Sequence, residues 1–340
     1  MVDFEWQIKN YLGLSAAVVS SGTQGLLFAL QAMGVRPGQK VILPSFSFMA
    51  TAQAVIYANA VPVFAEIGFD LTICPSDLRR LLSQHENVGA VIPVHIFGMP
   101  CQILEINEIV SAFSKKSGRK IPVIYDSAHA FGSVYRGERI GNFGDAEVFS
   151  LSATKILTTI EGGLIASSNK DFIEEICKMR NYGMAPYSYN ASTTGLNGKM
   201  SEFHACIGLE NLKRLQDILK IRREKAKYFW QQIEAKTSFQ CLHHPTHVFP
   251  NFKYFTVLLP KELQERRRRV IDFLKEQGVE TRTYFYPPIH QQEYFMRFSS
   301  RRLPKTETIS RRVLTLPFFT SITKDEMDYI VSLLLEAERI

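Results

Sequence analysis

Cysteine is scarce in this chain of 340 residues, and its five copies lie far apart. No two of them stand at the spacing of a zinc knuckle or a disulfide framework, so we expect no metal site and a reducing compartment. Long apolar runs are also missing. No stretch reaches bilayer length, and the acidic start Met1-Val2-Asp3-Phe4-Glu5-Trp6 lacks the basic and apolar parts of a signal peptide. We therefore expect a cytoplasmic protein with no membrane association.

Acidic residues are outnumbered, since 40 lysines and arginines face 33 aspartates and glutamates and leave a net charge of +7. A positive surplus raises the possibility of an anionic partner such as nucleic acid or a phosphorylated metabolite. The dense basic run from Arg266 to Arg269 adjoins Val270, Ile271, Phe273 and Leu274, which form the apolar stripe of a surface helix. Aromatic residues are not interleaved with the basic ones, so we expect a solvated helix face and no nucleic acid.

The order of apolar runs predicts the fold class. From about residue 15 to 170, short apolar runs alternate with helical stretches, which indicates an α/β fold with a mostly parallel central sheet flanked by helices. A helical region follows from 170 to about 233, interrupted by a polar loop over 182–199. We predict a large α/β domain over 1–234 and a smaller C-terminal α+β domain over 235–340.

The smaller domain is expected to mix strands and helices. Its pattern predicts a strand over 252–259, a helix ending at 277, a strand over 279–284 and a closing helix over 324–338.

Two residues at predicted strand ends point to chemistry. Asp126 directly follows the apolar run 121–125, which is typical of a buried parallel strand. Lys155 lies in a polar turn after the strand that ends near Leu151, and Glu161-Gly162-Gly163 follow. Because ligands bind at the carboxyl ends of such strands, an acid and a lysine there indicate a cofactor pocket.

Two further segments fit such a pocket. The run Ser20-Ser21-Gly22-Thr23-Gln24-Gly25 follows a strand and opens a helix, so its backbone N–H groups and hydroxyls can hold a phosphate. The run 44–51 places Phe48 where a ring could stack on a flat cofactor. Each signal is weak alone, and Phe48 would more often be a core residue.

Taken in this order, the segments resemble the DegT/StrS family of sugar aminotransferases, pyridoxal-phosphate enzymes of the aspartate-aminotransferase fold (fold type I). The resemblance extends over most of the chain. It also includes the segments Val94-His95-Ile96-Phe97-Gly98-Met99-Pro100, Gly141-Asn142-Phe143-Gly144-Asp145, Gly195-Leu196-Asn197, Met200-Ser201-Glu202 and Tyr286-Pro287-Pro288-Ile289-His290.

The resemblance implies roles for three central residues. Lys155 matches the lysine that holds the cofactor aldehyde as a Schiff base and later moves a proton, although an isolated lysine is by default a solvated one. Asp126 matches the carboxylate that pairs with the pyridine nitrogen, with a helix N-cap as its alternative. His129 would reach the ring hydroxyl, with a satisfied core histidine as the competing interpretation.

Other positions match the rest of a cofactor site. Gly22, Thr23 and Ser150 match phosphate-binding positions, Gln24 could contribute through its backbone N–H, and Phe48 matches the stacking aromatic. Asn197 matches an asparagine that reaches the cofactor phosphate of the neighbouring subunit, so the resemblance implies a homodimer with shared active sites. Its alternative is a turn residue between Leu196 and Gly198.

The implied activity is transfer of an amino group, with L-glutamate as the expected donor, to a nucleotide-activated keto-sugar. The cofactor would be pyridoxal 5'-phosphate, with pyridoxamine phosphate between the two halves of the reaction. Tyr286 and His290 are candidates at the sugar end, although Tyr-Pro-Pro could equally be a rigid turn. Two alternatives remain, a sugar dehydratase of the same fold and a non-catalytic binding module. Relatives of the first kind usually carry histidine in place of the lysine, and the second would be favoured by loss of Lys155 or Asp126.

The chain also departs from the family pattern. The stretch before the phosphate-binding segment looks about one helix shorter, Gly25 stands where alanine is usual, and Cys101 replaces a polar residue. The first departure bears on the sugar pocket more than on the cofactor.

Overall fold

The computed structural model describes all residues except Tyr187 and Ser300, and position 187 of the expected 182–199 loop therefore lies outside the described part. The central strands form a four-stranded and a three-stranded sheet, in the orders β1-β9-β8-β5 and β3-β2-β4. Parallel bridges from Val91 to Val123 and from Val94 to Asp126 join the two sheets along one edge. The strands are β1 Ser15–Val19, β2 Lys40–Pro44, β3 Val61–Ala65, β4 Val88–Val91, β5 Ile124–Asp126, β8 Ala146–Ser150 and β9 Gly163–Ser167.

Strand direction confirms the α/β prediction with one exception. Strand β2 is parallel to β3 and β4, and β5 is parallel to β8. Strand β9 runs antiparallel to both β8 and β1. An antiparallel neighbour needs no crossover helix, so a loop alone connects β8 to β9. That loop carries Lys155.

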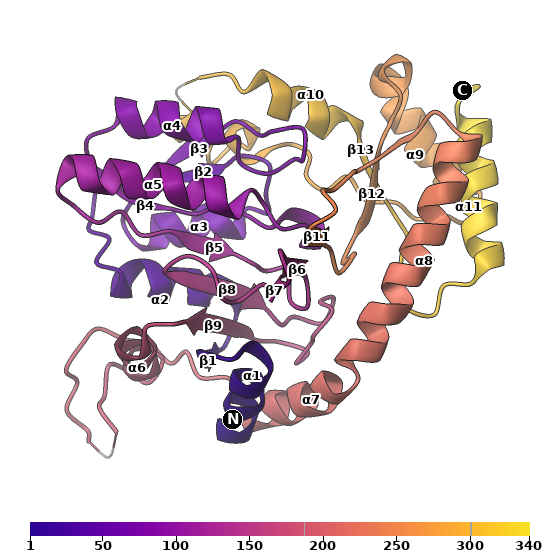
Figure 1. The fold of residues 1–340 in the computed structure, drawn as a ribbon. Helices are drawn as coiled ribbons and strands as arrows, with labels where there is room; N and C mark the ends of the chain where they lie inside the picture. The colour runs from indigo at the N-terminus through magenta and orange to yellow at the C-terminus, as the bar shows by residue number, and fades with distance from the viewer. Residues whose placement is uncertain (187, 300) are drawn as a thin grey trace.

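Helices cover both faces of this sheet (Figure 1). One apolar cluster joins the sheet to the first set of helices through Phe4, Ile8, Leu78 and Ile106, and a second cluster uses the opposite face. The first set is α1 Val2–Leu12, α4 Pro75–Gln84 and α5 Ile103–Ser117. The second set is α2 Gly22–Ala32, α3 Ala50–Tyr57 and α6 Lys170–Met179. Because helices pack against both faces of the sheet, a ligand can reach it only at the ends of its strands.

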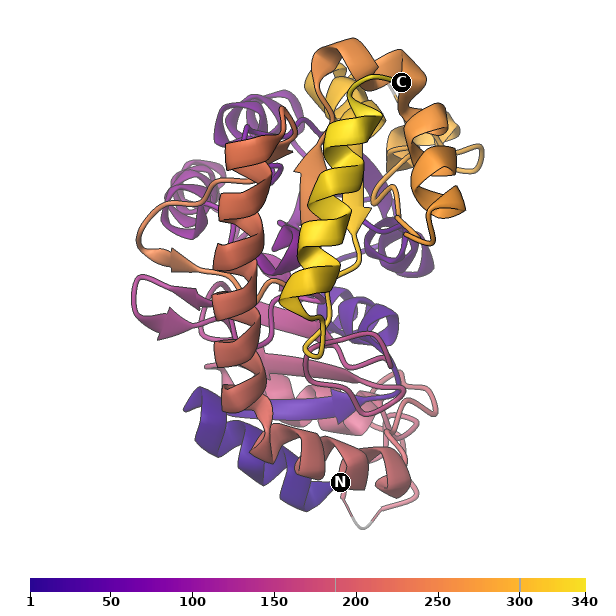
Figure 2. The ribbon, with the colours of Figure 1, turned by 90° about the vertical axis from the view of Figure 1, so that its right-hand side faces the viewer.

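The C-terminal part builds a separate core around a small antiparallel sheet of order β10-β12-β13. Its strands are β10 Gln240–Cys241, β12 Phe255–Leu258 and β13 Val313–Leu316. The helices around it are α8 Leu215–Lys236, α9 Arg267–Glu276, α10 Pro304–Arg312 and α11 Lys324–Ala337, and Figure 2 shows α8 and α11 side by side. Helix α7, Glu202–Lys213, leads into α8. Since α8 spans residue 234, the division at that residue stays a prediction.

The remaining elements are short. They comprise the small sheet β11-β6-β7, made of Val248–Phe249, Val134–Tyr135 and Glu138–Arg139, and the 3₁₀ turns η1 Ile96–Gly98, η2 Lys261–Arg266, η3 Ile289–Gln291 and η4 Met296–Phe298.

One strand prediction is wrong. The segment 279–284 contributes a single antiparallel bridge, Arg282 to Thr315, and forms no strand. The chain leaves the sheet there because Tyr284 and Phe285 turn toward the strand ends of the large sheet, where both line a pocket. Strand β13, which follows directly on the basic end of α10, takes the edge position instead. The expected strand 252–259 is shortened to β12.

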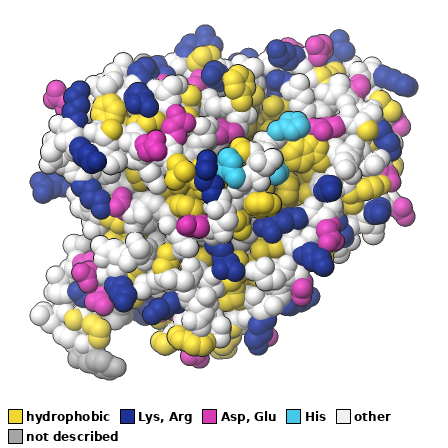
Figure 3. Space-filling model, in the orientation of Figure 1, with side chains coloured by type: hydrophobic (Ala, Val, Ile, Leu, Met, Phe, Trp, Pro, Cys, Tyr) yellow, Lys and Arg dark blue, Asp and Glu magenta, His cyan; other side chains and the backbone are white. Residues whose placement is uncertain are grey.

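Arg266 ends the turn η2, and the rest of the basic run lies on α9, where Val270 and Leu274 are buried, so the helical prediction is confirmed. On the face drawn in Figure 3, lysine and arginine side chains are scattered among acidic and uncharged ones. Among the described residues, no helix has the length and apolar character needed to cross a membrane.

Candidate functional site

A pocket opens where β1, β5 and β8 end and the C-terminal part approaches them. It gathers seven of the residues singled out from the sequence, namely Gly22, Thr23, Phe48, Asp126, His129, Ser150 and Lys155. Other lining residues include Thr51, Ser152, Glu161, Tyr254, Tyr284 and Phe285. Segments more than two hundred residues apart thus form one site.

The N-terminus of α2 forms one end of the pocket. Ser21 caps the helix by accepting a hydrogen bond from the backbone N–H of Gln24 at 3.2 Å. Gly22 lies against β8, where an added Cβ would stand 3.1 Å from the Cβ of Ser150. The helix therefore starts close to the end of β8, with its first N–H groups and the Thr23 and Ser150 side chains at the pocket. Such an end suits a phosphate, because free N–H groups and the helix dipole favour negative charge.

Asp126 is a buried carboxylate at the end of β5, 5% exposed. Its Oδ2 accepts a hydrogen bond from the Thr51 hydroxyl at 2.7 Å, and its Oδ1 accepts one from the Ala128 N–H at 3.1 Å. Burial raises the pKa of Asp126, while these two bonds and the charge of Lys155 act in the opposite direction. A protonated ring nitrogen placed beside this carboxylate would hold it ionised.

Lys155 sits in the β8–β9 loop, half-buried beside Asp126. Burial lowers the pKa of its amine to about 8, and the charge of Asp126 partly opposes this shift. A larger fraction of the amine is therefore neutral near physiological pH than for a solvated lysine. Only the neutral amine is nucleophilic, so Lys155 is chemically able to attack a carbonyl at this pH.

His129 provides a polar atom without a partner. Its Nδ1 is buried and forms no hydrogen bond with any residue in the described part of the chain. Burial and the charges of Lys155 and Lys253 hold its pKa well below the usual range, so the ring is neutral. The ring stacks on Phe285 at 6.2 Å and meets the edge of Tyr254 at 5.2 Å between centroids. An orphaned nitrogen beside this pocket fits a ligand hydroxyl.

Phe48 lies at the rim; the residue is 51% exposed, and the centre of its ring lies 6.2 Å from that of Phe285. An exposed aromatic face beside Lys155 and Asp126 suits stacking on a flat ring. Thr51, three residues further and the second residue of α3, escaped the sequence analysis as a separate site residue. Its helical spacing from Phe48 is the signal that could have identified it.

The structure does not bring every predicted residue to this pocket. The carboxamide of Gln24 bonds to Ser20, away from the lining, and Asn197 pairs by backbone with Asn181. The Cζ atom of the Arg267 guanidinium lies 3.9 Å from the centre of the Tyr286 ring. His290 is buried and bonded through Nδ1 to the Ser45 hydroxyl at 2.6 Å. Roles for these four residues stay predictions.

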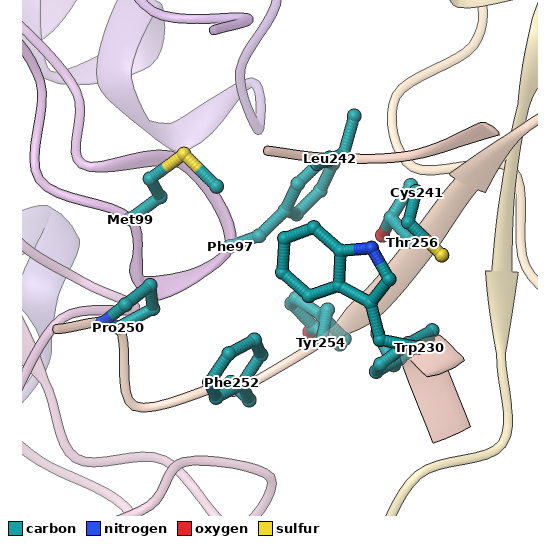
Figure 4. Close-up of a pocket in the computed structure, with 10 residues that line it drawn as sticks. Phe97, Met99, Trp230, Cys241, Leu242, Pro250, Phe252, Tyr254 and Thr256 are labelled. Carbon is teal, nitrogen blue, oxygen red and sulfur yellow. The ribbon is translucent and has the colours of Figure 1, made fainter. Parts of the chain in front are cut away.

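A second, mostly apolar cavity lies behind Tyr254, which lines both spaces. Figure 4 shows Phe97, Met99, Trp230 and Phe252 around it. Its walls hold no carboxylate, amine or imidazole among the described residues, so its main contribution is to pack against Tyr254.

Comparison with known proteins finds a family that covers nearly the whole chain. Residues 1–335 match the model of the DegT/DnrJ/EryC1/StrS aminotransferase family. The dTDP-4-amino-4,6-dideoxy-D-glucose transaminase of Shigella dysenteriae is 31% identical over 335 residues, which cover 98% of this chain and 88% of that protein. The GDP-perosamine synthase of Caulobacter vibrioides is 31% identical, with 98% and 89% covered.

A solved structure shares the fold. The sugar aminotransferase Spr1654 of Streptococcus pneumoniae, described as putative and in its PLP form, superposes with a TM-score of 0.92 at 24% identity. The match covers 99% of this chain and 90% of that one.

Proposed function

The chain belongs to the DegT/DnrJ/EryC1/StrS aminotransferase family, and from this premise we propose how its own residues perform the reaction. It is a pyridoxal-phosphate-dependent sugar aminotransferase. In our proposal it takes an amino group from L-glutamate and delivers it to the keto carbon of a nucleotide-linked sugar. We also propose a cytoplasmic location, because the five cysteines are free thiols and thiols stay reduced in that compartment.

The observation that carries the proposal is the placement of Lys155. Its amine, with a pKa of about 8, lies beside the buried carboxylate of Asp126, and the N-terminus of α2 lies in the same pocket. A nucleophile, an acid for a ring nitrogen and a phosphate cradle are what pyridoxal phosphate needs from a protein. The residues present therefore fit this cofactor.

Each residue has a task in holding the cofactor. Gly22 and Thr23 would bind its phosphate with Ser150, Phe48 would cover one face of its ring, and the orphaned nitrogen of His129 would meet the ring hydroxyl. Asp126, oriented by Thr51, would keep the ring nitrogen protonated. When bound, the cofactor supplies an electron sink for the charge that develops on the reacting carbon.

Lys155 would also move the proton. Its neutral amine, in the same pocket as Asp126, would take the proton from the reacting carbon of the amino donor and give it back at a neighbouring carbon. In the second half of the reaction the same amine would transfer a proton in the opposite direction, to the sugar carbon that receives the amino group. The low pKa of about 8 supports both directions, because acid and base forms are both populated near neutral pH.

The substrate class follows from the relatives. The name of the Shigella protein places an amino group on C4 of a 6-deoxyhexose attached to dTDP, and a ketone at C4 is the form that accepts such an amine. A net charge of +7 also suits an anionic nucleotide-linked sugar.

We further propose a homodimer with shared sites. Asn197 lies outside the pocket of its own chain, as expected for a residue that serves the partner's cofactor. Large exposed apolar side chains such as Leu196 and Phe203, near Asn197 in sequence, would be covered by such an interface.

Transfer of labelled nitrogen tests the function. The protein loaded with cofactor is incubated with ¹⁵N-labelled L-glutamate and either dTDP- or GDP-linked 4-keto-6-deoxyhexose, and the sugar is analysed by mass spectrometry. We expect a labelled amino sugar. A dehydrated sugar without label would instead indicate a dehydratase, and an unchanged sugar with every acceptor and donor would indicate a binding module.

A further inference from the structure

Lys253 is a lysine that the roles above leave unused. It is 9% exposed, and its Nζ lies 3.9 Å from the centre of the Tyr254 ring. It makes no salt bridge with any residue that the structure describes. A buried ammonium is costly unless an anion compensates it, and a ring face compensates only in part. An anionic ligand would supply the compensation that the ring does not.

The backbone around Lys253 is fixed to the active-site loop. Asn251 is fully buried, and its Nδ2 donates hydrogen bonds to the carbonyl oxygens of His129 at 2.7 Å and Phe131 at 2.9 Å. Its Oδ1 accepts from the Lys253 N–H at 2.8 Å. Arg222 binds the Lys253 carbonyl at 3.2 Å. The position of Lys253 is thus tied to that of His129.

The surroundings of Lys253 are positively charged. Burial and the neighbouring charges of Lys155 and Arg222 lower its pKa to about 7, and its own charge lowers the pKa of His129. Two carboxylates line the pocket. Asp126 is engaged by Thr51 and the Ala128 N–H, and Glu161 is exposed at the rim. The side of the pocket formed by Lys155 and Tyr254, on whose ring Lys253 lies, can therefore accept an anion.

Arg180 does not compete for this role. Its guanidinium pairs with Glu5 of α1 and donates to the Val18 carbonyl oxygen at 2.6 Å. It ties α1 to β1 and is not available to a substrate.

We propose that Lys253 binds the α-carboxylate of the amino donor while the donor's amino nitrogen stands at Lys155. This inference rests on the proposed function. In an amino acid the α-carboxylate is attached to the carbon that bears the reacting nitrogen, so its cation must lie close to Lys155. Lys253 is not itself a lining residue, but its Nζ lies on the ring of Tyr254, which lines the pocket together with Lys155. Its flexible stem lets the ammonium turn from that ring toward the ligand.

Measuring the two half-reactions separately distinguishes binding of the donor carboxylate from a general effect on the active site. The absorbance of the bound cofactor is the readout in both halves. The donor half starts from the pyridoxal form and L-glutamate, and the sugar half starts from the pyridoxamine form and the keto-sugar. We compare wild type, Lys253→Met, Lys253→Arg and the control Lys227→Met, which changes an exposed lysine of α8. Binding of 2-methyl-L-glutamate, which has no α-proton to lose, gives a dissociation constant independent of turnover.

We expect Lys253→Met to weaken L-glutamate, L-alanine and the methyl analogue alike by about 10- to 100-fold, the loss of one charge-assisted bond. Lys253→Arg should recover part of the affinity, and Lys227→Met should match wild type. The sugar half should keep its rate, and unfolding should not occur at lower temperature, because methionine fills the same space without a buried charge.

Unchanged donor affinity in Lys253→Met, or equal slowing of both halves, would overturn the inference. Weakened affinity for L-glutamate but not for L-alanine would assign Lys253 to the side-chain carboxylate of glutamate and would also contradict the inference. A wild type inactive in the donor half would refute the proposed function itself.

Discussion

At the scale of single residues, burial determines the chemistry of the site. The amine of Lys155 has a pKa of about 8 because the pocket disfavours its charged form. The chain thereby obtains a nucleophile at neutral pH without a separate base.

Cofactor capture should therefore depend on pH. The rate at which the free protein combines with pyridoxal phosphate is expected to rise with pH and to level off above about 8, since the amine is protonated and unreactive below its pKa. Stopped-flow absorbance at a series of pH values measures this rate. A midpoint near the value of a solvated lysine would contradict the account.

We expect the negative charge of Asp126 to be required for activity. Asp126→Asn keeps the shape but cannot hold the ring nitrogen protonated, so we expect kcat to fall on the order of 100-fold or more. Thr51→Val removes only the orienting bond and should cost about tenfold. Steady-state kinetics of both variants tests this order, and equal effects would argue against it.

At the scale of elements, β8 is anchored by a second buried acid. Glu147 accepts hydrogen bonds from the N–H groups of Gly141 and Phe143 at 2.7 and 2.9 Å and from the Ser127 hydroxyl at 2.5 Å. His95 Nε2 lies 3.7 Å away and is neutral, because burial lowers its pKa to about 3. The network ties β8 to the turn before it and to the residue after Asp126.

Glu147 should make stability depend on pH. Burial raises its pKa to about 7 from the ordinary 4.5, so the folded state binds the proton more tightly and stability falls as pH rises from 4.5 to 7. Glu147→Gln should remove this slope, which amounts to at most about 3 kcal/mol in the free energy of unfolding. Urea unfolding of both proteins across this range measures the difference. Parallel pH profiles would show that the carboxyl does not titrate there.

At the scale of the whole molecule, the proposed dimer makes each site depend on two chains. Lys155→Ala destroys the site of its own subunit, whereas Asn197→Ala would impair that of the partner. A mixture of the two variants, refolded or exchanged together, should regain up to about a quarter of wild-type activity, because half of the dimers then hold one intact site. Activity against the mixing ratio tests this, and no recovery in confirmed mixed dimers would place Asn197 elsewhere.

The sequence predicts those parts that depend on order along the chain. Asp126, Lys155 and the start of α2 follow strand ends, and strand ends of a mostly parallel sheet meet at one edge. Tyr254 and Lys253 come from the C-terminal part, and their approach depends on tertiary packing that local patterns do not encode. For the same reason the pattern over 279–284 gave a strand where the chain instead turns into the pocket.

The most direct test of the central claim is the absorption spectrum of the purified protein with pyridoxal phosphate, before and after L-glutamate, alongside Lys155→Ala. We predict a visible band in wild type that glutamate bleaches toward the spectrum of pyridoxamine phosphate, and no normal band in the variant. A wild type without the band, or a variant with the same band, would contradict the assignment of Lys155.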